Sequence, residues 1–421
     1  MSDTAKKRIL FITPYYPPEI GAPQSRISEL AKKLKDRGHE VFILCAVPNY
    51  PSGVIPKEYR GKFLIKQKIN GIPVYRTYIF AAPNKGFLKR LLTHLSFAAA
   101  SLLAFAKIRR EINAEISIVE SPPLFMAFTA IAMKLIFGVP YIFNVSDVWP
   151  DSAVELGMLK NKFLIKCASF LEAAAYKFSA GVACVTRGIV DNIRRKNVEF
   201  RRVHFLPNGV DCSFFSHEKL ASGGYDADIS EFQAKFGLKD KFIVLYSGTI
   251  GISQNLGFLI DIAEKSADKE KIHFLIVGDG AEREKLEEKV RSLGLKNVSF
   301  ERLIPKAKMP ALISLAGACV VSLLDIAVFR GALPSKMYEY MAMKKPILMF
   351  AAGECVELIE KARAGLASYP GDTAAALKNL AALAEDNKAS AEMGENAFKF
   401  VSENFSRDVI CSKWEKTLEK L

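Results

Sequence analysis

The chain has 421 residues, half of them hydrophobic, and a formal net charge of +14. This length predicts two or three domains, and the apolar content excludes a globally disordered chain. The positive charge favours polyanionic partners, namely nucleic acid, anionic lipid or phosphorylated substrates. Because the sequence has no helix-turn-helix spacing, zinc-finger pattern or RNA-binding aromatic motif, no nucleic-acid partner is predicted.

The cysteines and histidines indicate in which cellular compartment the protein works and whether it binds a metal. The seven cysteines are dispersed, and none forms a Cys-x-x-Cys pair. This pattern predicts reduced thiols, buried as small core residues, in a cytosolic protein. The five histidines are equally dispersed, so no metal site is predicted. The apolar run after Arg8 has the length of a strand and soon meets Pro14, so no signal peptide is predicted.

Short β-branched runs alternate with helical patterns through the first half of the chain. A helix is predicted at residues 25–37, with Ile27, Leu30 and Leu34 on one face. The strands are nearly continuous apolar runs, as expected when helices cover both faces of a parallel sheet. They are predicted at residues 8–13, 40–46, 74–80, 116–120, 141–145, 182–185 and 203–206.

One uncharged stretch, residues 91–106, allows two interpretations. It is shorter than a typical membrane span. It fits a helix of the protein core, and it also fits a helix that rests on an anionic bilayer, because basic residues stand at both ends. These flanking residues are Lys85, Lys89, Arg90, Lys107, Arg109 and Arg110.

A second α/β series follows a pause in the pattern. Residues 208–241, rich in Gly, Ser and Asp, are interpreted as the interdomain connection, with one short helix near 229–236. Residues 389–421 are predicted to be helical, with a break near 404–406. The pattern predicts a second doubly wound parallel sheet, and ligands would bind at the carboxyl ends of the strands, in a cleft between the domains. The strands are predicted at 242–247, 273–277, 298–301, 319–323, 346–350 and 366–369, with helices at 256–265 and 281–293.

The most informative stretch begins at Leu333 and ends in a buried strand at Leu348. Pro334 blocks a helix before it, and Ser335 is a good N-cap, so a helix is predicted to start here. Such a helix start favours an anion, and Lys336 adds a fixed positive charge. Glu339 follows about one turn later, near the same face. A cation with free amides suits phosphate and a carboxylate suits hydroxyls, so the stretch is typical of binding to the ribose diphosphate of a nucleotide sugar.

Two loops of the first domain follow predicted strands and carry candidate site residues. In the loop after Thr13, Gly21 permits close approach of a ligand or of another backbone, although a Pro-rich loop is also often structural. After the strand that starts at Tyr141, Asp147 is a candidate for catalysis or substrate binding. Trp149 offers a flat apolar face on which a sugar can stack.

Two glycine loops of the second domain have a comparable position. Gly248 and Gly251 follow the strand that ends at Ser247, and such a loop can present backbone amides to phosphate. Gly278 and Gly280 follow the next strand, where a tight turn is an equally good interpretation.

The chain contains an ordered set of motifs: Pro17-Pro18-Glu19-x-Gly21, Asp147-x-Trp149-Pro150, Pro207-Asn208-Gly209-Val210-Asp211, Ser247-Gly248, Val277-Gly278-Asp279-Gly280 and Pro334-Ser335-Lys336-x-x-Glu339-x-Met341-Ala342. This set resembles family 4 of the retaining glycosyltransferases over nearly the whole chain, in a branch similar to bacterial N-acetyl-L-fucosaminyltransferases of O-antigen and capsule synthesis. The resemblance implies a GT-B fold, with an acceptor-binding domain at residues 1–210 and a nucleotide-sugar-binding domain at 211–399. A C-terminal helix, at about residues 400–421, would cross back to the first domain.

The resemblance also assigns roles to individual residues. Glu339 would bind the donor ribose, the amides around Gly248 and Ser335 would hold the diphosphate, and Gly21 would approach it from the other domain. The implied donor-binding set is Gly21, Gly248, Thr249, Gln254, Gly278, Asp279, Pro334, Ser335, Lys336 and Glu339, and the implied acceptor-binding set is Glu19, Asp147 and Trp149.

Several positions depart from the family pattern. Gly331 stands where many members carry a Glu that contacts the sugar, and the histidine that many members have near Asp147 is absent. Thr249 and Gln254 occupy the loop that often holds an Arg and a Lys. Neutralisation of the diphosphate is therefore expected from Arg330 and Lys336, which with Asp147 form the predicted catalytic set.

The predicted function is retaining, metal-independent transfer of a sugar from a UDP-sugar donor to a polyprenyl-diphosphate-linked saccharide in surface polysaccharide synthesis. The sugar is expected to be an N-acetylated hexosamine or a 6-deoxyhexosamine, and no cofactor is expected. The protein is expected in the cytoplasm, bound peripherally to the anionic inner face of the plasma membrane. Three alternatives stay open: a non-hydrolysing nucleotide-sugar epimerase, a transferase with a soluble acceptor, and a non-catalytic sensor or scaffold.

Overall fold

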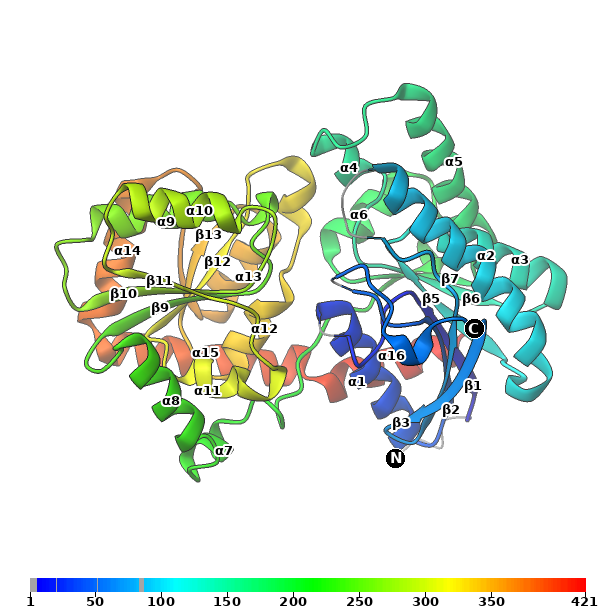
Figure 1. Ribbon diagram of the computed structural model, residues 1–421, viewed down its shortest axis with the longest axis horizontal. Helices are drawn as coiled ribbons and strands as arrows, with labels where there is room; N and C mark the ends of the chain where they lie inside the picture. The colour runs from blue at the N-terminus through cyan, green and yellow to red at the C-terminus, as the bar shows by residue number, and fades with distance from the viewer. Residues whose placement is uncertain (1–5, 20, 51, 83–86) are drawn as a thin grey trace. The chain divides into compact units, whose positions relative to one another are not determined.

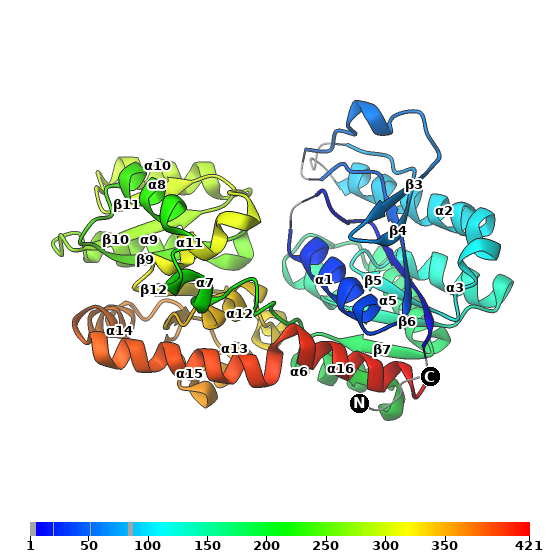
Figure 2. The same ribbon diagram turned by 90° about the horizontal axis from the view of Figure 1, so that it is seen from below.

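The computed structural model describes residues 6–19, 21–50, 52–82 and 87–421, so Lys85 and Ile20 lie outside the described residues. The chain divides into two compact units (Figures 1 and 2). The first consists of Met1–Asn208 together with Arg407–Leu421, and the second is Gly209–Ser406. From the sequence, the divisions are expected after residue 210 and near residue 400.

The first unit is built on an eight-stranded sheet in the order β3-β4-β2-β1-β5-β6-β7-β8. All neighbours pair in parallel except β3 and β4, which are antiparallel. The strand order reverses between β1 and β5, which makes their carboxyl ends a topological switch point. The strands are β1 Arg8–Thr13, β2 Glu40–Ala46, β3 Leu64–Ile69, β4 Ile72–Thr77, β5 Ile116–Ser121, β6 Tyr141–Val145, β7 Gly181–Cys184 and β8 Val203–Phe205.

Both faces of this sheet are covered, as the continuous apolar strands predict. Along β1, Leu10 and Ile12 pack into one hydrophobic core, and Ile9 and Phe11 pack into another on the opposite face. The first core also contains residues of α2, α3, α5 and α6, and the second contains residues of α1 and α16. The helices of this unit are α1 Ala22–Asp36, α2 Phe87–Ile112, α3 Met126–Phe137, α4 Asp151–Glu155, α5 Lys162–Phe178, α6 Arg187–Arg195 and α16 Arg407–Leu418.

The C-terminal helix α16 belongs to the first unit, which confirms the predicted return of the chain. Its apolar face, including Trp414, is buried in the same core as α1. An ion pair between Arg407 and Glu29 of α1 fixes its first turn, with 2.6 Å between Nη2 and Oε2. The break predicted near residues 404–406 is confirmed, because α15 (Asn387–Phe405) ends just before Ser406.

Helix α2 is longer than the predicted stretch at 91–106. Residues Lys89–Ile112 form a stretch of 24 residues that contains an 18-residue window with mean hydropathy 1.6, which by length and composition alone is enough to cross a membrane. One face of the helix, however, is part of the core on the sheet, where Phe97, Phe105 and Ile112 are fully or almost fully buried. The structure therefore favours the first of the two interpretations of this stretch, a helix of the core.

The second unit is built on a six-stranded, fully parallel sheet in the order β11-β10-β9-β12-β13-β14. Its order reverses between β9 and β12. Along β9, Leu245 and Tyr246 point into cores on opposite faces. The predicted pair of parallel-sheet α/β domains is thus confirmed. The strands are β9 Phe242–Ser247, β10 Ile272–Val277, β11 Val298–Glu301, β12 Ala318–Ser322, β13 Ile347–Phe350 and β14 Gly365–Ser368.

The stretch at 208–241, predicted as an interdomain connection, is instead almost entirely part of the second unit. It forms two helices rather than one, and Phe215, Phe232 and Leu238 are buried in the core of this unit, which removes them from water. The helices of the second unit are α7 His217–Ala221, α8 Asp226–Phe236, α9 Leu256–Lys265, α10 Arg283–Ser292, α11 Met309–Ser314, α12 Ser335–Ala342, α13 Glu354–Ala362, α14 Thr373–Glu385 and α15 Asn387–Phe405.

Candidate functional site

The two glycine loops of the second unit lie against each other at the carboxyl ends of β9 and β10. The amide of Ile250 donates to the carbonyl of Asp279 at 2.9 Å. A Cβ on Gly278 would come within 1.8 Å of the carbonyl oxygen of Gly248, and the φ of Gly278 is +152°. Glycine is therefore required at 278 for the packing of one loop on the other. This contact goes beyond the tight turn that the sequence suggests.

Two tyrosines hold the start of the Gly248 loop in place. The buried hydroxyl of Tyr340, from α12, lies 2.9 Å from both the amide nitrogen and the Oγ of Ser247. Tyr246 donates from its hydroxyl to the carbonyl of Thr249. The loop backbone is thereby fixed to the helix that carries Lys336 and Glu339.

Lys336 lies against this loop. Its Nζ is 3.7 Å from the centre of the Tyr246 ring, a cation–π distance, and a Cβ on Gly248 would stand 2.8 Å from the same nitrogen. Burial lowers the pKa of Lys336 to about 7, and Glu339, one turn along α12, opposes that shift. An anion bound here would favour the charged ammonium form. The structure thus brings together Gly248 and Lys336, two of the predicted donor-binding residues.

The start of α12 differs from the prediction in one respect. Pro334, with φ −60° and ψ 127°, occupies the N-cap position, and no side chain caps the helix. Ser335 is the first helical residue rather than the N-cap, because proline already supplies the extended backbone that an N-cap needs. The positive end of the helix dipole still lies beside Lys336.

The remaining predicted donor residues are engaged in local contacts. The side-chain oxygen of Gln254 accepts from the amide of Gly251 at 3.3 Å. Asp279 is exposed at the end of β10, and its Oδ1 accepts from the amide of Gly280. Arg330 is paired with Asp325, with 2.9 Å between Nε and Oδ1, so a carboxylate already neutralises its charge.

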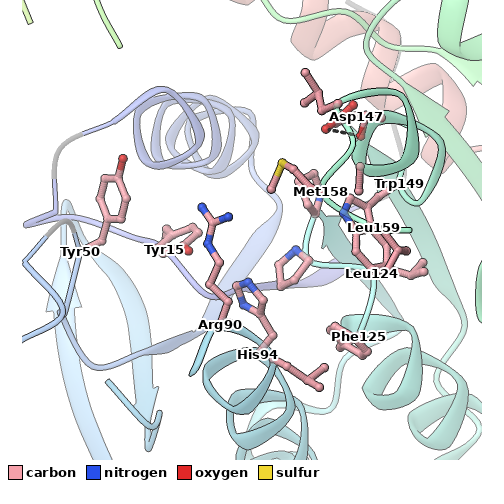
Figure 3. Close-up of a pocket in the computed structure, with 16 residues that line it drawn as sticks. Tyr15, Tyr50, Arg90, His94, Leu124, Phe125, Asp147, Trp149, Met158 and Leu159 are labelled. Carbon is pink, nitrogen blue, oxygen red and sulfur yellow. Dashed lines mark hydrogen bonds between the residues drawn. The ribbon is translucent and has the colours of Figure 1, made fainter. Parts of the chain in front are cut away.

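The first unit contains a pocket of about 580 Å³ at its switch point. Its wall is formed by the loops after β1, β2, β5 and β6, by the start of α2, and by α4 with the segment after it (Figure 3). Most of the lining is apolar, and it includes Leu124, Phe125 and Leu159. A position at the carboxyl ends of the central strands is where open α/β sheets bind ligands.

Asp147 and Trp149, both predicted acceptor residues, line this pocket together. Burial raises the pKa of the Asp147 carboxyl, while a hydrogen bond from Ser152 at 3.0 Å opposes that shift. Trp149 packs near Phe125, with 6.1 Å between ring centroids. The pocket therefore combines an aromatic wall with a carboxylate, which suits a sugar hydroxyl beside an apolar group.

Glu19, the third predicted acceptor residue, does not line the pocket. It is buried and accepts hydrogen bonds from the amides of Tyr16, Asn49 and Tyr50, at 3.3, 2.8 and 2.8 Å. Its carboxylate thus orders the loop that presents Tyr50 to the pocket. Gly21 stands at the N-cap position of α1, where φ is 165°.

Sequence reasoning missed the polar groups that α2 contributes to the pocket, Arg90 and His94, which Figure 3 shows between Tyr15 and Trp149. Burial and the charge of Arg90 lower the pKa of His94 to about 4, so the imidazole is neutral at neutral pH. Arg90 brings positive charge to a mostly apolar pocket, which suits a phosphate attached to an apolar chain. In the sequence, Arg90 stands out only as one of the basic residues that flank residues 91–106.

Among the residues that the structure describes, no group of three or more His, Cys, Asp or Glu side chains could hold a metal ion.

The enzyme class of the protein follows from its similarity to two known families. Residues 21–209 match the family described as glycosyl transferase 4-like domain, and residues 228–400 match glycosyl transferases group 1. The chain is a two-domain glycosyltransferase. It is 28% identical over 333 residues to WcaI of Escherichia coli strain K12, a glycosyl transferase named for colanic acid biosynthesis, and the match covers 78% of this chain and 79% of WcaI.

Solved structures show the fold of this glycosyltransferase. Sucrose-phosphate synthase from Thermosynechococcus elongatus matches with a TM-score of 0.75 and 17% identity, over 98% of both chains. HepE of Anabaena, crystallised in complex with UDP-glucose, matches with a TM-score of 0.71 and 17% identity, over 98% of this chain and 99% of HepE. The fold is GT-B, as the sequence predicts.

Proposed function

We propose that this glycosyltransferase binds the diphosphate of a UDP-sugar at Lys336 and the Gly248 loop. The contact that carries the proposal is the placement of the Lys336 ammonium against Gly248 and the Tyr246 ring, beside the start of α12. The family matches and the nucleotide-sugar complex of HepE support a nucleotide-sugar donor. Glu339, one turn along α12, would bind the ribose hydroxyls.

The acceptor is proposed to be a saccharide on a polyprenyl diphosphate. The pocket of the first unit supports this class, because it combines an aromatic and aliphatic wall with Arg90 for phosphate and Asp147 for a sugar hydroxyl. The relationship to a glycosyl transferase named for colanic acid biosynthesis supports a role in surface polysaccharide synthesis. The protein would work in the cytoplasm, at the inner face of the plasma membrane. The transferred sugar is proposed to be an N-acetylated hexosamine or 6-deoxyhexosamine.

The reaction is proposed to retain the configuration at the anomeric carbon, without a metal. The bond from that carbon to the diphosphate oxygen breaks, a bond to the acceptor hydroxyl oxygen forms on the same face, and the hydroxyl proton leaves with the diphosphate. Negative charge develops on the departing diphosphate, where the Lys336 ammonium and preorganised amides would stabilise it.

A Lys336→Ala variant tests the donor site. Turnover should fall by about two orders of magnitude or more, because the charge that meets the leaving group is lost. UDP affinity should fall more than uridine affinity, since uridine has no diphosphate. A variant that transfers sugar at the wild-type rate would exclude this role. Incubation of the wild type with UDP-sugars alone serves as a second arm, since isomerised donor without acceptor would identify an epimerase instead.

A further inference from the structure

The segment after α4 and the first half of α5 project an apolar surface from the first unit. Met158, Phe163 and Phe170 are 55%, 72% and 77% exposed. Within residues 161–170 no side chain is buried, although the segment is helical from Lys162 onward. We call residues 158–170 the apolar cap.

The apolar cap is exposed because α5 is longer than its neighbour α3. Both helices lead from the carboxyl end of one strand to the next, and Nζ of Lys134 in α3 donates to the carbonyl of Phe178 at the end of α5. Helix α5 has 17 residues and α3 has 12, so α5 is longer by more than one turn. The first residues of α5 therefore extend past the start of α3, and Figure 1 shows the start of α5 rising beyond α2 and α3.

The helix within the apolar cap has local support for its conformation. The side chain of Asn161 accepts hydrogen bonds from the amides of Phe163 and Leu164, at 2.9 and 3.2 Å, which caps α5. Phe163 and Phe170 are seven residues apart, about two turns, so they share one face. This capped helix thus holds two phenylalanines in water on one side, a costly arrangement unless something covers them.

Charge indicates what covers the apolar cap. Residues 158–170 contain Lys160, Lys162 and Lys166 and no acidic residue. Lysines interspersed with exposed phenylalanine and leucine are the composition of a helix that lies in the interface of an anionic bilayer. A protein partner with an apolar groove would not require this concentration of one charge.

The apolar cap is continuous with the pocket. Met158 and Leu159 line the pocket, and Met158 is also among the exposed residues of the cap. A second path is aromatic: Trp149 and Phe125 line the pocket, and Phe125 stacks on the exposed Phe128, with 6.4 Å between centroids. Apolar side chains thus lead from the pocket wall to the surface at the start of α3, the helix beside α5.

We propose that the apolar cap inserts its phenylalanines into the surface of an anionic bilayer, and that a lipid-linked acceptor passes from the bilayer into the pocket along it. The passage of the acceptor rests on the proposed function, whereas the insertion does not. The membrane-contacting helix is then the first half of α5 rather than residues 91–106 of α2, whose inner face lies in the core.

Flotation with vesicles tests the insertion. The wild type should float with vesicles of equal parts phosphatidylglycerol and phosphatidylcholine, and weakly or not at all with phosphatidylcholine alone. A Phe163→Ser/Phe170→Ser variant should bind at least about tenfold more weakly. The matched control is Leu135→Ser/Ile136→Ser in α3, which removes two residues of similar exposure, 64% and 65%, outside the apolar cap and should float like the wild type.

Three results would overturn the insertion. The first is a wild type that does not float, and the second is a Phe163→Ser/Phe170→Ser variant that floats as well as the wild type. The third is that the apolar cap binds a second copy of the chain. The last would appear in light scattering as a wild-type dimer that the cap variant abolishes, without flotation. Turnover with a short, water-soluble phosphate-linked acceptor should be unchanged in the cap variant, and turnover with a vesicle-borne acceptor should fall. If the wild type transferred no sugar to either acceptor, the proposed function would be rejected, but the flotation result would still hold.

Discussion

Asp325 holds the guanidinium of Arg330 in an ion pair at the surface of the second unit. Nε and Nη2 of Arg330 donate to the two carboxylate oxygens at 2.9 and 3.1 Å, and Tyr369 donates to the same carboxylate. The hydrogen bond and charge of Asp325 raise the pKa of Arg330, and the pair lowers the pKa of Asp325. Two residues predicted to share the donor charge, Arg330 and Lys336, are therefore in unequal positions.

An Arg330→Ala variant should change donor affinity by less than about threefold, because the charge that it removes is already balanced by Asp325. Lys336→Ala should weaken donor binding by about tenfold or more, the loss expected for a charged hydrogen bond. Calorimetric titration with UDP measures both. Lys344→Ala, in the turn after α12, is the control for loss of a lysine, since its ammonium pairs with Glu395. Equal losses in the two variants would show that Arg330 contacts the diphosphate.

The pH dependence of donor binding should report Lys336. Its pKa is lowered to about 7 in the unliganded protein, so the ammonium becomes neutral as the pH rises above 7. The diphosphate binds the charged form, so affinity should fall above pH 7 by up to about tenfold per pH unit, with uptake of a proton on binding. Titration in buffers of different ionisation enthalpy at alkaline pH measures that uptake. In Lys336→Arg the guanidinium stays charged, and both effects should disappear. The same slope in this variant would assign the titration to another group.

Tyr340 should stabilise the Gly248 loop through its hydroxyl. Tyr340→Phe removes the hydrogen bonds to Ser247 and should lower the free energy of unfolding by about 1–2 kcal/mol, with weaker UDP binding. The matched control is Tyr338→Phe in the same helix. Tyr338 is equally buried, its hydroxyl has no hydrogen-bond partner among the described residues, and its ring stacking on Phe405 would remain. Denaturant unfolding measures the change in the free energy of unfolding for both variants. An equal effect of the two changes would mean that the Ser247 contact does not matter.

Substitutions of Glu19 and Asp147 should have different effects: the first should lower the stability of the protein, and the second should weaken acceptor binding. Glu19→Ala leaves three amides, two of them in buried contacts, without their acceptor and should lower the free energy of unfolding by at least about 2 kcal/mol. Asp147→Asn keeps the side-chain shape, so the free energy of unfolding should change by only about 0.5 kcal/mol, while KM for the acceptor rises. Unfolding curves and acceptor kinetics are the two measurements. A stable Glu19→Ala protein with a raised acceptor KM would restore the predicted contact.

Most strands could be predicted from the sequence because buried parallel strands are apolar along their whole length. Strand β3 was missed for the opposite reason. It pairs antiparallel at the edge of the sheet, and its burial alternates, with Lys66 and Lys68 exposed. Asn70 and Gly71, both with positive φ, form the turn to β4, and this Asn-Gly pair was the available signal.

The parts of the candidate site that lie next to a recognisable strand or helix could be predicted from the sequence. The contacts between residues far apart in the sequence could not. The Gly248 loop was found because it follows a recognisable strand, and Lys336 because it lies in the first turn of a recognisable helix. The partners of Arg330 and Glu19 are side-chain and backbone groups that only the fold brings within reach. The pocket was missed because its wall combines loops after four strands with residues of α2 and of the segment after α4.

The place of α16 in the first unit has a consequence for synthesis of the protein. Ile410, Trp414 and Leu418 complete a core whose other residues belong to the first half of the chain, including Ile27 and Leu34 of α1. A ribosome must therefore make the whole second unit before the first can close this core. Until then the part of α1 that α16 covers stays in contact with water, so the nascent first unit is a natural client for a chaperone, and it matures after the second unit despite being made earlier.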